Sequence, residues 1–299
     1  MSAGMVIYES INHCLVCSSR ELYVLYPEIT HTCGILNSLG FKENISSSVY
    51  RCKDCNHCFL SPRLSEETIT NYYHKLNSEY FDKTPLHTRI DEDKKVLEKV
   101  KSLKESGKVL EIGCGNGFLL SLLRNEGYET FGIEPSPKAA DFAKYSLNLN
   151  VVNGFLNIDS FSNMKFDIIF MMDVIEHLYQ PNDMLKLCSE YLATGGIIVL
   201  LTGNVDSLNA KIWREKWFYF YSWEHISFFN KSSISKLLSR NNIQTLSYEN
   251  ISHSGGFLMN FFTLFVKNFL IYIYNFYWKR KYKHSNLAFD HMLVIGQKL

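Results

Sequence analysis

Residues 108–202 alternate short apolar runs with amphipathic runs, and this alternation constrains the fold more than any other feature of the chain. The apolar runs, such as KVLEI and FDIIFMM, are typical of buried strands, and runs such as GFLLSLLRNEG have helical spacing. Strands that alternate with helices form a mostly parallel sheet, because each helical crossover lies over one of its faces. The pattern therefore predicts an α/β fold.

The loop after the first of these strands, in VLEIGCGNGF, is rich in glycine. Gly113, Gly115 and Gly117 lack a Cβ, so a ligand can approach the main chain where the next helix begins. Their spacing differs from the G-x-G-x-x-G of dinucleotide-binding loops. Glu111 favours a cationic ligand, and Glu134 ends the next strand, where an acid suits ribose hydroxyls. A ligand with a ribose, a positive charge and no phosphate indicates S-adenosylmethionine.

These residues resemble the motifs of class I S-adenosylmethionine-dependent methyltransferases. EIGCGNG matches the first motif of that family, Glu134 its ribose-binding acid and FDIIFMMDVIEHL its fourth strand with the following loop. The resemblance implies a Rossmann-like, mostly parallel seven-stranded sheet with helices on both faces. It also implies which residues contact S-adenosylmethionine: Glu111, Gly113, Cys114, Gly115, Gly117, Glu134, Phe155, Leu156 and Asp173.

Two C-x-x-C pairs stand near the N-terminus, CLVC at 14–17 and CKDC at 52–55. Four thiolates can close a tetrahedral zinc site with no open position, so the metal would be structural. The predicted ligands are Cys14, Cys17, Cys52 and Cys55. Ser18 and Asn56 follow the pairs, where a knuckle needs a residue that tolerates the left-handed conformation. His57 or Cys58 could replace one ligand, and four unrelated cysteines remain the alternative.

The cysteine pairs and the residues up to NYY are similar to the front end of bacterial methyltransferases of sugar and polysaccharide biosynthesis. These include zinc-bearing C-methyltransferases of deoxysugars. In that group a Tyr-x-x-Glu-His stretch after the fifth strand supplies catalytic groups, and Tyr221, Glu224 and His225 match it. The resemblance implies His225 as the base, with Glu224 and Tyr221 as substrate contacts.

A histidine base suits this reaction because its pKa lies near neutral pH. His177, in DVIEHL, is a second contact or an alternative base, since open α/β sheets bind ligands at this edge. The alternative for His225 is a histidine packed among aromatic residues with both ring nitrogens bonded.

Residues 257–278 are rich in Phe, Leu, Ile and Tyr, and a basic stretch extends to Lys283. The length suggests a membrane span, but Lys267 and the strands expected on both sides oppose one. An interfacial helix, a lid and a dimer contact stay open. The predicted division is 1–63, zinc-binding module; 64–105, helical linker; 106–250, cofactor-binding methyltransferase domain; 251–285, apolar helical insertion; and 286–299, final strand of the sheet.

Net charge and cysteine content indicate which partners and which cellular compartment to expect. The net charge of +1 provides no general attraction for nucleic acid, so none is expected as a partner. Eight cysteines behind an N-terminus that does not resemble a signal peptide predict a reducing, cytoplasmic setting. Residues 257–283 additionally suggest peripheral contact with the inner face of the membrane.

The main prediction is a methyltransferase for a sugar or glycan acceptor in bacterial cell-surface polysaccharide or deoxysugar biosynthesis. Three alternatives stay open: an O-methyltransferase for a lipid or quinone at the membrane surface, a zinc-ribbon RNA-binding methyltransferase or module, and an inactive scaffold. The sequence does not decide between carbon and oxygen as the methylated atom.

Overall fold

The computed structural model describes residues 8–31, 45–73, 86–222, 224–251 and 290–299. The predicted apolar segment and membrane contact at 257–283 lie outside these residues. Among the helices that are described, none combines the length and the apolar character that a membrane crossing requires.

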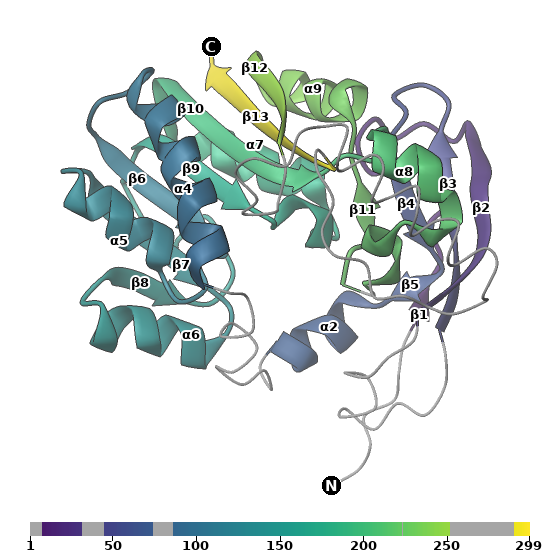
Figure 1. Ribbon diagram of the computed structural model, residues 1–299, viewed down its shortest axis with the longest axis horizontal. Coiled ribbons are helices and arrows are strands. Elements are labelled where there is room, and N and C mark those ends of the chain that lie inside the picture. Colours follow the sequence, from purple (N-terminus) through teal and green to yellow (C-terminus); the bar gives the residue numbers. More distant parts are fainter. Residues whose placement is uncertain (1–7, 32–44, 74–85, 223, 252–289) are drawn as a thin grey trace, which may run out of the picture.

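Seven strands form the central sheet in the order β12-β13-β10-β9-β6-β7-β8 (Figure 1). The strands are β6 (Lys108–Ile112), β7 (Glu129–Glu134), β8 (Asn150–Asn153), β9 (Phe166–Met172), β10 (Leu192–Gly203), β12 (Ile243–Ile251) and β13 (His291–Lys298). The strands from β10 to β8 pair in parallel, whereas β13 is antiparallel to both β10 and β12.

The predicted count of seven strands is confirmed, but the sheet is mixed, which corrects the prediction of a mostly parallel one. The sequence could not show this, because the side chains of β13 are buried along most of its length. A strand buried on both faces has the same apolar pattern in either direction.

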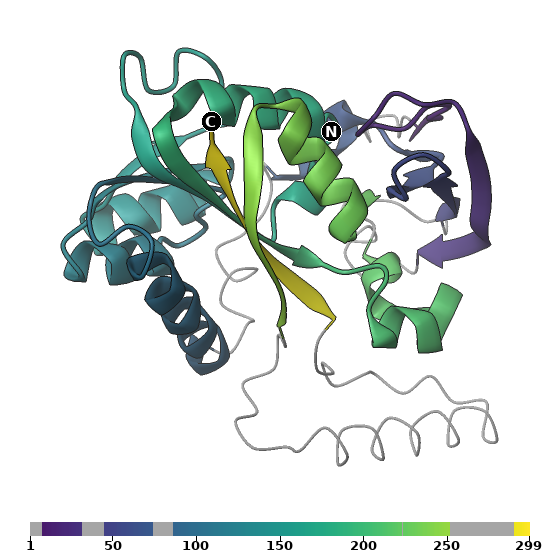
Figure 2. The same ribbon diagram turned by 90° about the horizontal axis from the view of Figure 1, so that it is seen from above.

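Helices cover both faces of the sheet (Figure 2). They include α4 (Leu86–Lys101), α5 (Phe118–Asn125), α6 (Pro137–Asp141), α7 (Pro181–Tyr191) and α9 (Lys231–Arg240). On one face, Val100 of α4 and Leu123 of α5 pack in one cluster with Val109 of β6. On the other face, Leu185 of α7 and Leu237 of α9 pack in a second cluster. The sheet is therefore the buried middle layer, and its strand ends are where a ligand can enter.

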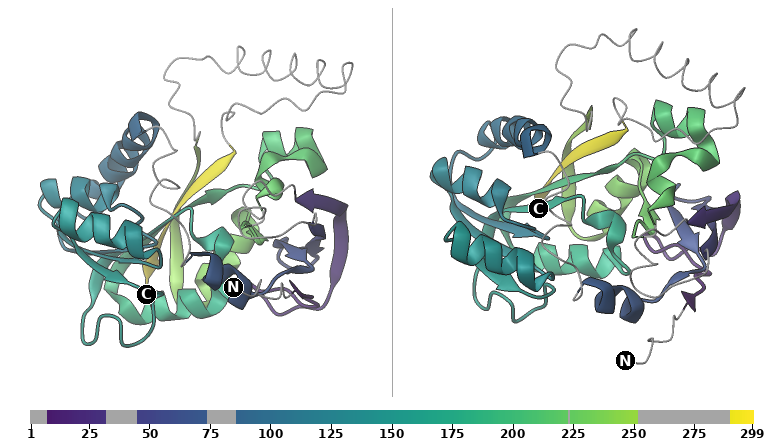
Figure 3. Two further views of the ribbon diagram at one scale, coloured as in Figure 1. Left: turned by 90° about the horizontal axis from the view of Figure 1, so that it is seen from below. Right: turned by 60° about the horizontal axis from the view of Figure 1, so that its bottom comes forward.

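A four-stranded sheet lies beside the central domain, in the order β11-β4-β3-β2 (Figures 1 and 3). Its strands are β2 (Leu22–His31), β3 (Ile45–Cys52), β4 (Cys58–Ser61) and β11 (Ser227–Phe228). The same N-terminal part also contains the helix α2 (Glu66–Tyr73) and an antiparallel pair of short strands, β1 (Tyr8–Glu9) and β5 (Arg63–Leu64). Because β11 comes from the segment after β10, the N-terminal sheet is completed by a strand from much later in the chain.

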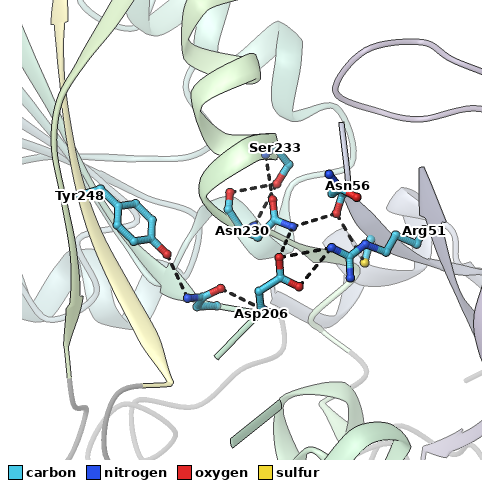
Figure 4. Close-up of polar contacts among 8 residues, drawn as sticks. Arg51, Asn56, Asp206, Asn230, Ser233 and Tyr248 are labelled. Atoms are coloured by element: carbon cyan, nitrogen blue, oxygen red, sulfur yellow. Dashed lines mark hydrogen bonds and ion pairs between the residues drawn. The ribbon is translucent and has the colours of Figure 1, made fainter. Parts of the chain in front are cut away.

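A polar network joins this N-terminal sheet to the central domain (Figure 4). The guanidinium of Arg51 forms an ion pair with Asp206, with 3.1 Å between Nη2 and Oδ1. The Nδ2 of Asn230 donates to Asp206 Oδ2 at 2.7 Å and to the carbonyl oxygen of Asn56 at 3.2 Å. The side chain of Asn230 also accepts the N–H of Ser233 at 2.9 Å and so caps α9. The network fixes the segment between β10 and α9 against the N-terminal sheet.

Candidate functional site

The glycine loop lies between β6 and α5, at the carboxyl edge of the sheet. Gly113, Gly115 and Gly117 have φ values of 70°, 51° and 77°. A Cβ on Gly113 would lie 2.7 Å from Val174, and one on Gly117 would lie 2.6 Å from Leu149. Backbone conformation and packing therefore both require glycine at these two positions. The bare main chain leads directly into the N-terminus of α5.

The carboxylate of Glu134, at the end of β7, is bonded to this loop. Its Oε2 accepts the N–H of Gly115 at 2.9 Å, and its Oε1 accepts the N–H of Ser136 at 2.8 Å. Burial raises the pKa of Glu134, and these two N–H groups oppose that shift. Each carboxylate oxygen keeps a further lone pair, so Glu134 could accept hydrogen bonds from two ligand hydroxyls.

Three other residues of the loop region are buried in different ways. Glu111 lies within β6 and is only 3% exposed. The thiol of Cys114 packs in a cluster with Leu120 and Val151, so only the main chain of Cys114 could contact a ligand. Asn116, which the sequence interpretation missed, is buried, and its Oδ1 has no hydrogen-bond partner among the described residues. An unsatisfied acceptor in this loop fits a ligand with an amino group, such as S-adenosylmethionine.

The remaining predicted cofactor residues follow β8 and β9. Phe155 is 48% exposed, whereas Leu156 is buried in the core. The exposed ring of Phe155 is thus the one of these two that could stack on a base. Asp173 directly follows β9 and adopts a left-handed conformation with φ of 55°. All three stand at the strand edge that also carries the glycine loop.

Two loops bring Glu176, His177 and His225 together, and we call these three residues the acceptor-side cluster. Glu176 and His177 belong to the 3-10 helix η2 after β9, and His225 belongs to the segment after β10. One possible ligand atom from each side chain lies within 4.8 Å of the other two. The N–H of Ile226 donates to the carbonyl oxygen of Glu176 at 3.0 Å and holds the two loops together.

The predicted catalytic residues differ in their hydrogen bonds and in their exposure to solvent. The Nδ1 of His225 lies 3.0 Å from the carbonyl oxygen of Tyr219, and the Nδ1 of His177 lies 3.0 Å from that of Glu224. Glu224 therefore orients His177 through its main chain. Burial, reinforced by His177, lowers the pKa of His225 to about 3, so its ring is neutral at pH 7. Tyr221 is 39% exposed at the end of the 3-10 helix η4, without a described contact to either histidine.

Glu176 is a site residue that the sequence interpretation missed. It is completely buried, and it accepts hydrogen bonds from the hydroxyls of Tyr219 and Thr202, the latter at 2.9 Å. Burial raises the pKa of Glu176. Its position beside His177 in DVIEHL was the signal that could have identified it.

His291, the first residue of β13, was also missed. Its Nδ1 lies 2.8 Å from Asp290 Oδ1, and its Nε2 lies 3.9 Å from Asp173 Oδ1. Asp290 and His291 are both almost completely buried. No local pattern marks this histidine, because only the insertion of β13 next to β10 brings it to Asp173.

The cysteines of the two C-x-x-C pairs meet in one cluster: Cys14, Cys17, Cys52 and Cys55. The Sγ atoms of Cys14 and Cys55 lie 3.4 Å apart, and those of Cys17 and Cys52 lie 3.5 Å apart. Sulfur ligands of a tetrahedral zinc ion, with bonds of about 2.3 Å, are separated by about 3.8 Å, so the four thiols could hold zinc.

The turns around this cluster have the geometry of metal-binding knuckles. Ser18 and Asn56, which follow the two pairs, have φ values of 64° and 62°. Cys58 lies outside the four-thiol group, and its Sγ contacts the carbonyl oxygen of Asn56 at 3.7 Å. The Nδ1 of His57 lies 3.8 Å from the Sγ of Cys14. The four C-x-x-C thiols are therefore the better ligand set.

Comparison with known proteins identifies the fold and the family. A family model described as a methyltransferase domain matches residues 86–248. A solved structure from Thermotoga maritima, described as an S-adenosylmethionine-dependent methyltransferase and possible histamine N-methyltransferase, aligns with a TM-score of 0.52 at 16% identity. The alignment covers 77% of this chain and 100% of that one, and it shows a shared fold.

Two curated relatives are named ubiquinone biosynthesis O-methyltransferase. That of Coxiella burnetii is 33% identical over 126 residues, which are 40% of this chain and 53% of the relative. That of Cereibacter sphaeroides is 30% identical over 105 residues, 33% of this chain and 42% of the relative. The chain thus spans about half the length of the curated relatives that it matches.

These comparisons favour the predicted quinone alternative over the sugar or glycan acceptor. They do not support the resemblance to deoxysugar C-methyltransferases or a role in polysaccharide biosynthesis. The family model nevertheless covers more than half of the chain. This protein therefore belongs to the methyltransferase-domain family and has the fold of the S-adenosylmethionine-dependent methyltransferases.

Proposed function

We propose that this protein transfers the methyl group of S-adenosylmethionine to a hydroxyl oxygen of a small aromatic acceptor of the hydroquinone type. One observation carries the proposal: the Glu134 carboxylate is bonded to the N–H of Gly115 at the sheet edge where the acceptor-side cluster also lies. This edge offers a place for a ribose and, on neighbouring strands, polar groups for a hydroxyl acceptor. The names of the curated relatives support oxygen as the methylated atom.

The cofactor would lie along the ends of β6, β7 and β9. Glu134 would bind the ribose, and Phe155, next to the buried Leu156, would flank the adenine. Glu111, the loop of Gly113, Cys114, Gly115 and Gly117, and Asp173 would contact the methionine part. When bound, S-adenosylmethionine supplies a methyl group that its positive sulfur has already activated.

The chain's own task is to orient the acceptor and to remove its proton. The acceptor oxygen would form its bond to the methyl carbon as the carbon–sulfur bond breaks, which releases S-adenosylhomocysteine. The hydroxyl proton would pass to His225, the predicted base, or to His177 as the alternative base. The Nδ1 atoms of His225 and His177 are bonded to carbonyl oxygens, which leaves the Nε2 of each ring for the acceptor. Glu224 and Tyr221 are proposed as contacts for the rest of the substrate, with Tyr221 at the exposed rim.

We further propose that Cys14, Cys17, Cys52 and Cys55 bind a structural zinc ion. All four coordination positions would be occupied by thiolates, so this zinc would not activate water or substrate. Its role would be to hold the turn that ends at Asn56, whose carbonyl oxygen accepts from Asn230.

The acceptor can be identified with radiolabelled S-adenosylmethionine and the full-length protein. A dihydroxybenzene with an alkyl tail, a nucleotide-linked deoxysugar and an RNA oligonucleotide would be offered in parallel. We expect label on an oxygen of the dihydroxybenzene alone. Label only in the sugar or the RNA would overturn the proposed acceptor, and an absence of S-adenosylhomocysteine binding in calorimetry would overturn the methyltransferase activity itself.

A further inference from the structure

A buried pair of titratable residues, Asp290 and His291, stands at the carboxyl edge of the sheet, and the proposed reaction does not use it. His291 begins β13 and lies opposite Gly203, the last residue of β10. The N–H of Asn204 donates to the carbonyl oxygen of Asp290 at 2.7 Å. The side chains of Asp290 and His291 are 1% and 4% exposed. The pair is therefore fixed in the interior where β10 ends.

The pair reaches across β10 to the carboxylate of Asp173. In the sheet β10 lies between β13 and β9, and Asp173 directly follows β9. The N–H of Asp173 donates to the carbonyl oxygen of Leu201 at 2.9 Å, which fixes its main chain beside β10. The Nε2 of His291 lies 3.9 Å from Asp173 Oδ1. The Asp173 side chain is 25% exposed, so Asp173 is the member of this group of three that a ligand could contact.

Both ring nitrogens of His291 face carboxylate oxygens. Nδ1 lies 2.8 Å from Asp290 Oδ1, and Nε2 faces Asp173. An ionised carboxylate only accepts hydrogen bonds, so this arrangement suits an imidazolium, in which both nitrogens donate. The positive ring would also compensate for the burial of the Asp290 carboxylate. The ring of Tyr219 packs edge-on against His291 with the centroids 5.5 Å apart, so the imidazole is held in this orientation.

Asp173 is a residue whose side chain needs to be held. Its main chain adopts the left-handed conformation, with φ of 55°, which is uncommon outside glycine and frequent at functional sites. The proposed function places Asp173 against the methionine part of the cofactor, which carries an ammonium group. A carboxylate that is already oriented loses less conformational freedom when it binds such a group. A contact with His291 on one side would orient it.

We propose that Asp290 and His291 are positioning residues of the cofactor site, and that His291 holds the Asp173 carboxylate against the ammonium group of S-adenosylmethionine. This role rests on the proposed function, because Asp173 has a ligand to meet only if the cofactor binds at this edge. His291 is too deeply buried to contact the ligand itself, so it acts through Asp173. The affinity for the cofactor would then depend on β13, which comes from the end of the chain.

Two substitutions of His291 separate its two contacts. His291→Asn places an amide near the position of Nδ1, so it can donate to Asp290 but does not reach Asp173. The longer side chain in His291→Gln places an amide near the position of Nε2, where it can donate to Asp173. In calorimetry with the full-length protein, the Kd for S-adenosylhomocysteine should rise about 10-fold in His291→Asn and less than about 3-fold in His291→Gln. Equal changes, or a larger change in His291→Gln, would show that His291 only satisfies Asp290 and would overturn the proposal.

A second ligand shows whether the effect passes through the ammonium group. Methylthioadenosine has the ribose and the adenine but lacks the part that carries the ammonium, so its Kd should be the same in the wild type and in both variants. In an Asp173→Asn background the two His291 variants should bind S-adenosylhomocysteine equally, because the contact that distinguishes them is gone. Equal weakening of both ligands would mean a general disturbance of the site and would overturn the proposal.

Asp290→Asn keeps the test decisive if the His291 variants fail to fold. It leaves an oxygen for Nδ1 of His291 but removes the charge that favours the imidazolium, and the Kd for S-adenosylhomocysteine alone should rise about 3-fold. An unchanged Kd would overturn the positioning role. Gln297→Asn, near the other end of β13, is the control and should bind both ligands as the wild type does. Loss of S-adenosylhomocysteine binding in the wild type would instead overturn the proposed function.

Discussion

The imidazole rings of His177 and His225 lie with their centroids 4.9 Å apart and their planes inclined by 69°. The two residues come from loops after different strands of the sheet. The ring of His177 is oriented by the carbonyl oxygen of Glu224, the residue directly before His225. The orientation of His177 therefore depends on the loop that carries His225, and substitutions in that loop should affect both rings.

The titration of His225 should make the protein less stable in acid. Burial and the neighbouring His177 lower the pKa of His225 to about 3, whereas an unfolded chain has the ordinary value of about 6.5. Between these pH values the unfolded state binds a proton that the folded state does not. The free energy of unfolding therefore falls as the pH decreases through this window. The full contribution of neutral His225 to stability is present above about pH 6.5.

The size of this effect follows from the two pKa values. One such group removes about 2 kcal/mol from the free energy of unfolding between pH 7 and pH 5. Urea denaturation at both pH values, without added divalent metal, would measure it in the wild type and in His225→Gln. The wild type should lose about 2 kcal/mol more than the variant. Equal losses would show that His225 does not titrate in this way.

Substitution of Glu134 should weaken cofactor binding without unfolding the protein. Glu134→Gln replaces one of two acceptor oxygens with an amide that faces a backbone N–H, and it removes the charge. Hydrogen bonds to a charged group contribute about 1.5–3 kcal/mol, so we expect the Kd for S-adenosylhomocysteine to rise about 10- to 100-fold in calorimetry. Glu129→Gln, at the exposed opposite end of β7, is the control. An unchanged Kd for Glu134→Gln would contradict the ribose assignment.

Removal of one cysteine ligand should release the proposed zinc. Cys52→Ser should lower the zinc content, measured by elemental analysis of the purified protein, from one ion per chain to a small fraction. Cys58→Ser is the matched control, because Cys58 is buried nearby but lies outside the four-thiol cluster. Full zinc content in Cys52→Ser, or equal loss in the two variants, would reject the assigned ligands.

Asn230→Ala should destabilise the protein. The Asn230 side chain caps α9 and donates to Asp206 and to the carbonyl oxygen of Asn56. Loss of an N-cap costs about 0.5–2 kcal/mol, and a free energy of unfolding lower by 1–2 kcal/mol in urea is expected. Ser239→Ala removes only an exposed contact at the end of the same helix and should change stability by less than about 0.5 kcal/mol. Similar values for both variants would exclude a special role for the network.

The sequence by itself determined the place of the glycine loop and the strands β6, β7, β9 and β10 with the helices between them, but it did not mark the short strand β8. It also indicated that Glu134 ends the strand beside that loop. These features follow from local patterns, because consecutive parallel strands joined by a helical crossover bring their carboxyl ends to one edge. The two C-x-x-C pairs were recognisable for the same reason: each is a short motif whose turn places both thiols together.

Only the tertiary structure decided the direction of β13, the addition of β11 to the N-terminal sheet and the meeting of Glu176 with His225. Each depends on contacts between segments far apart in the chain. An apolar strand has the same pattern in both directions, and a histidine has the same local sequence whether its Nε2 faces a carboxylate or a hydrophobic wall. What distinguishes these cases is the main-chain carbonyl or hydroxyl that another segment supplies, such as the oxygen of Glu224 beside His177.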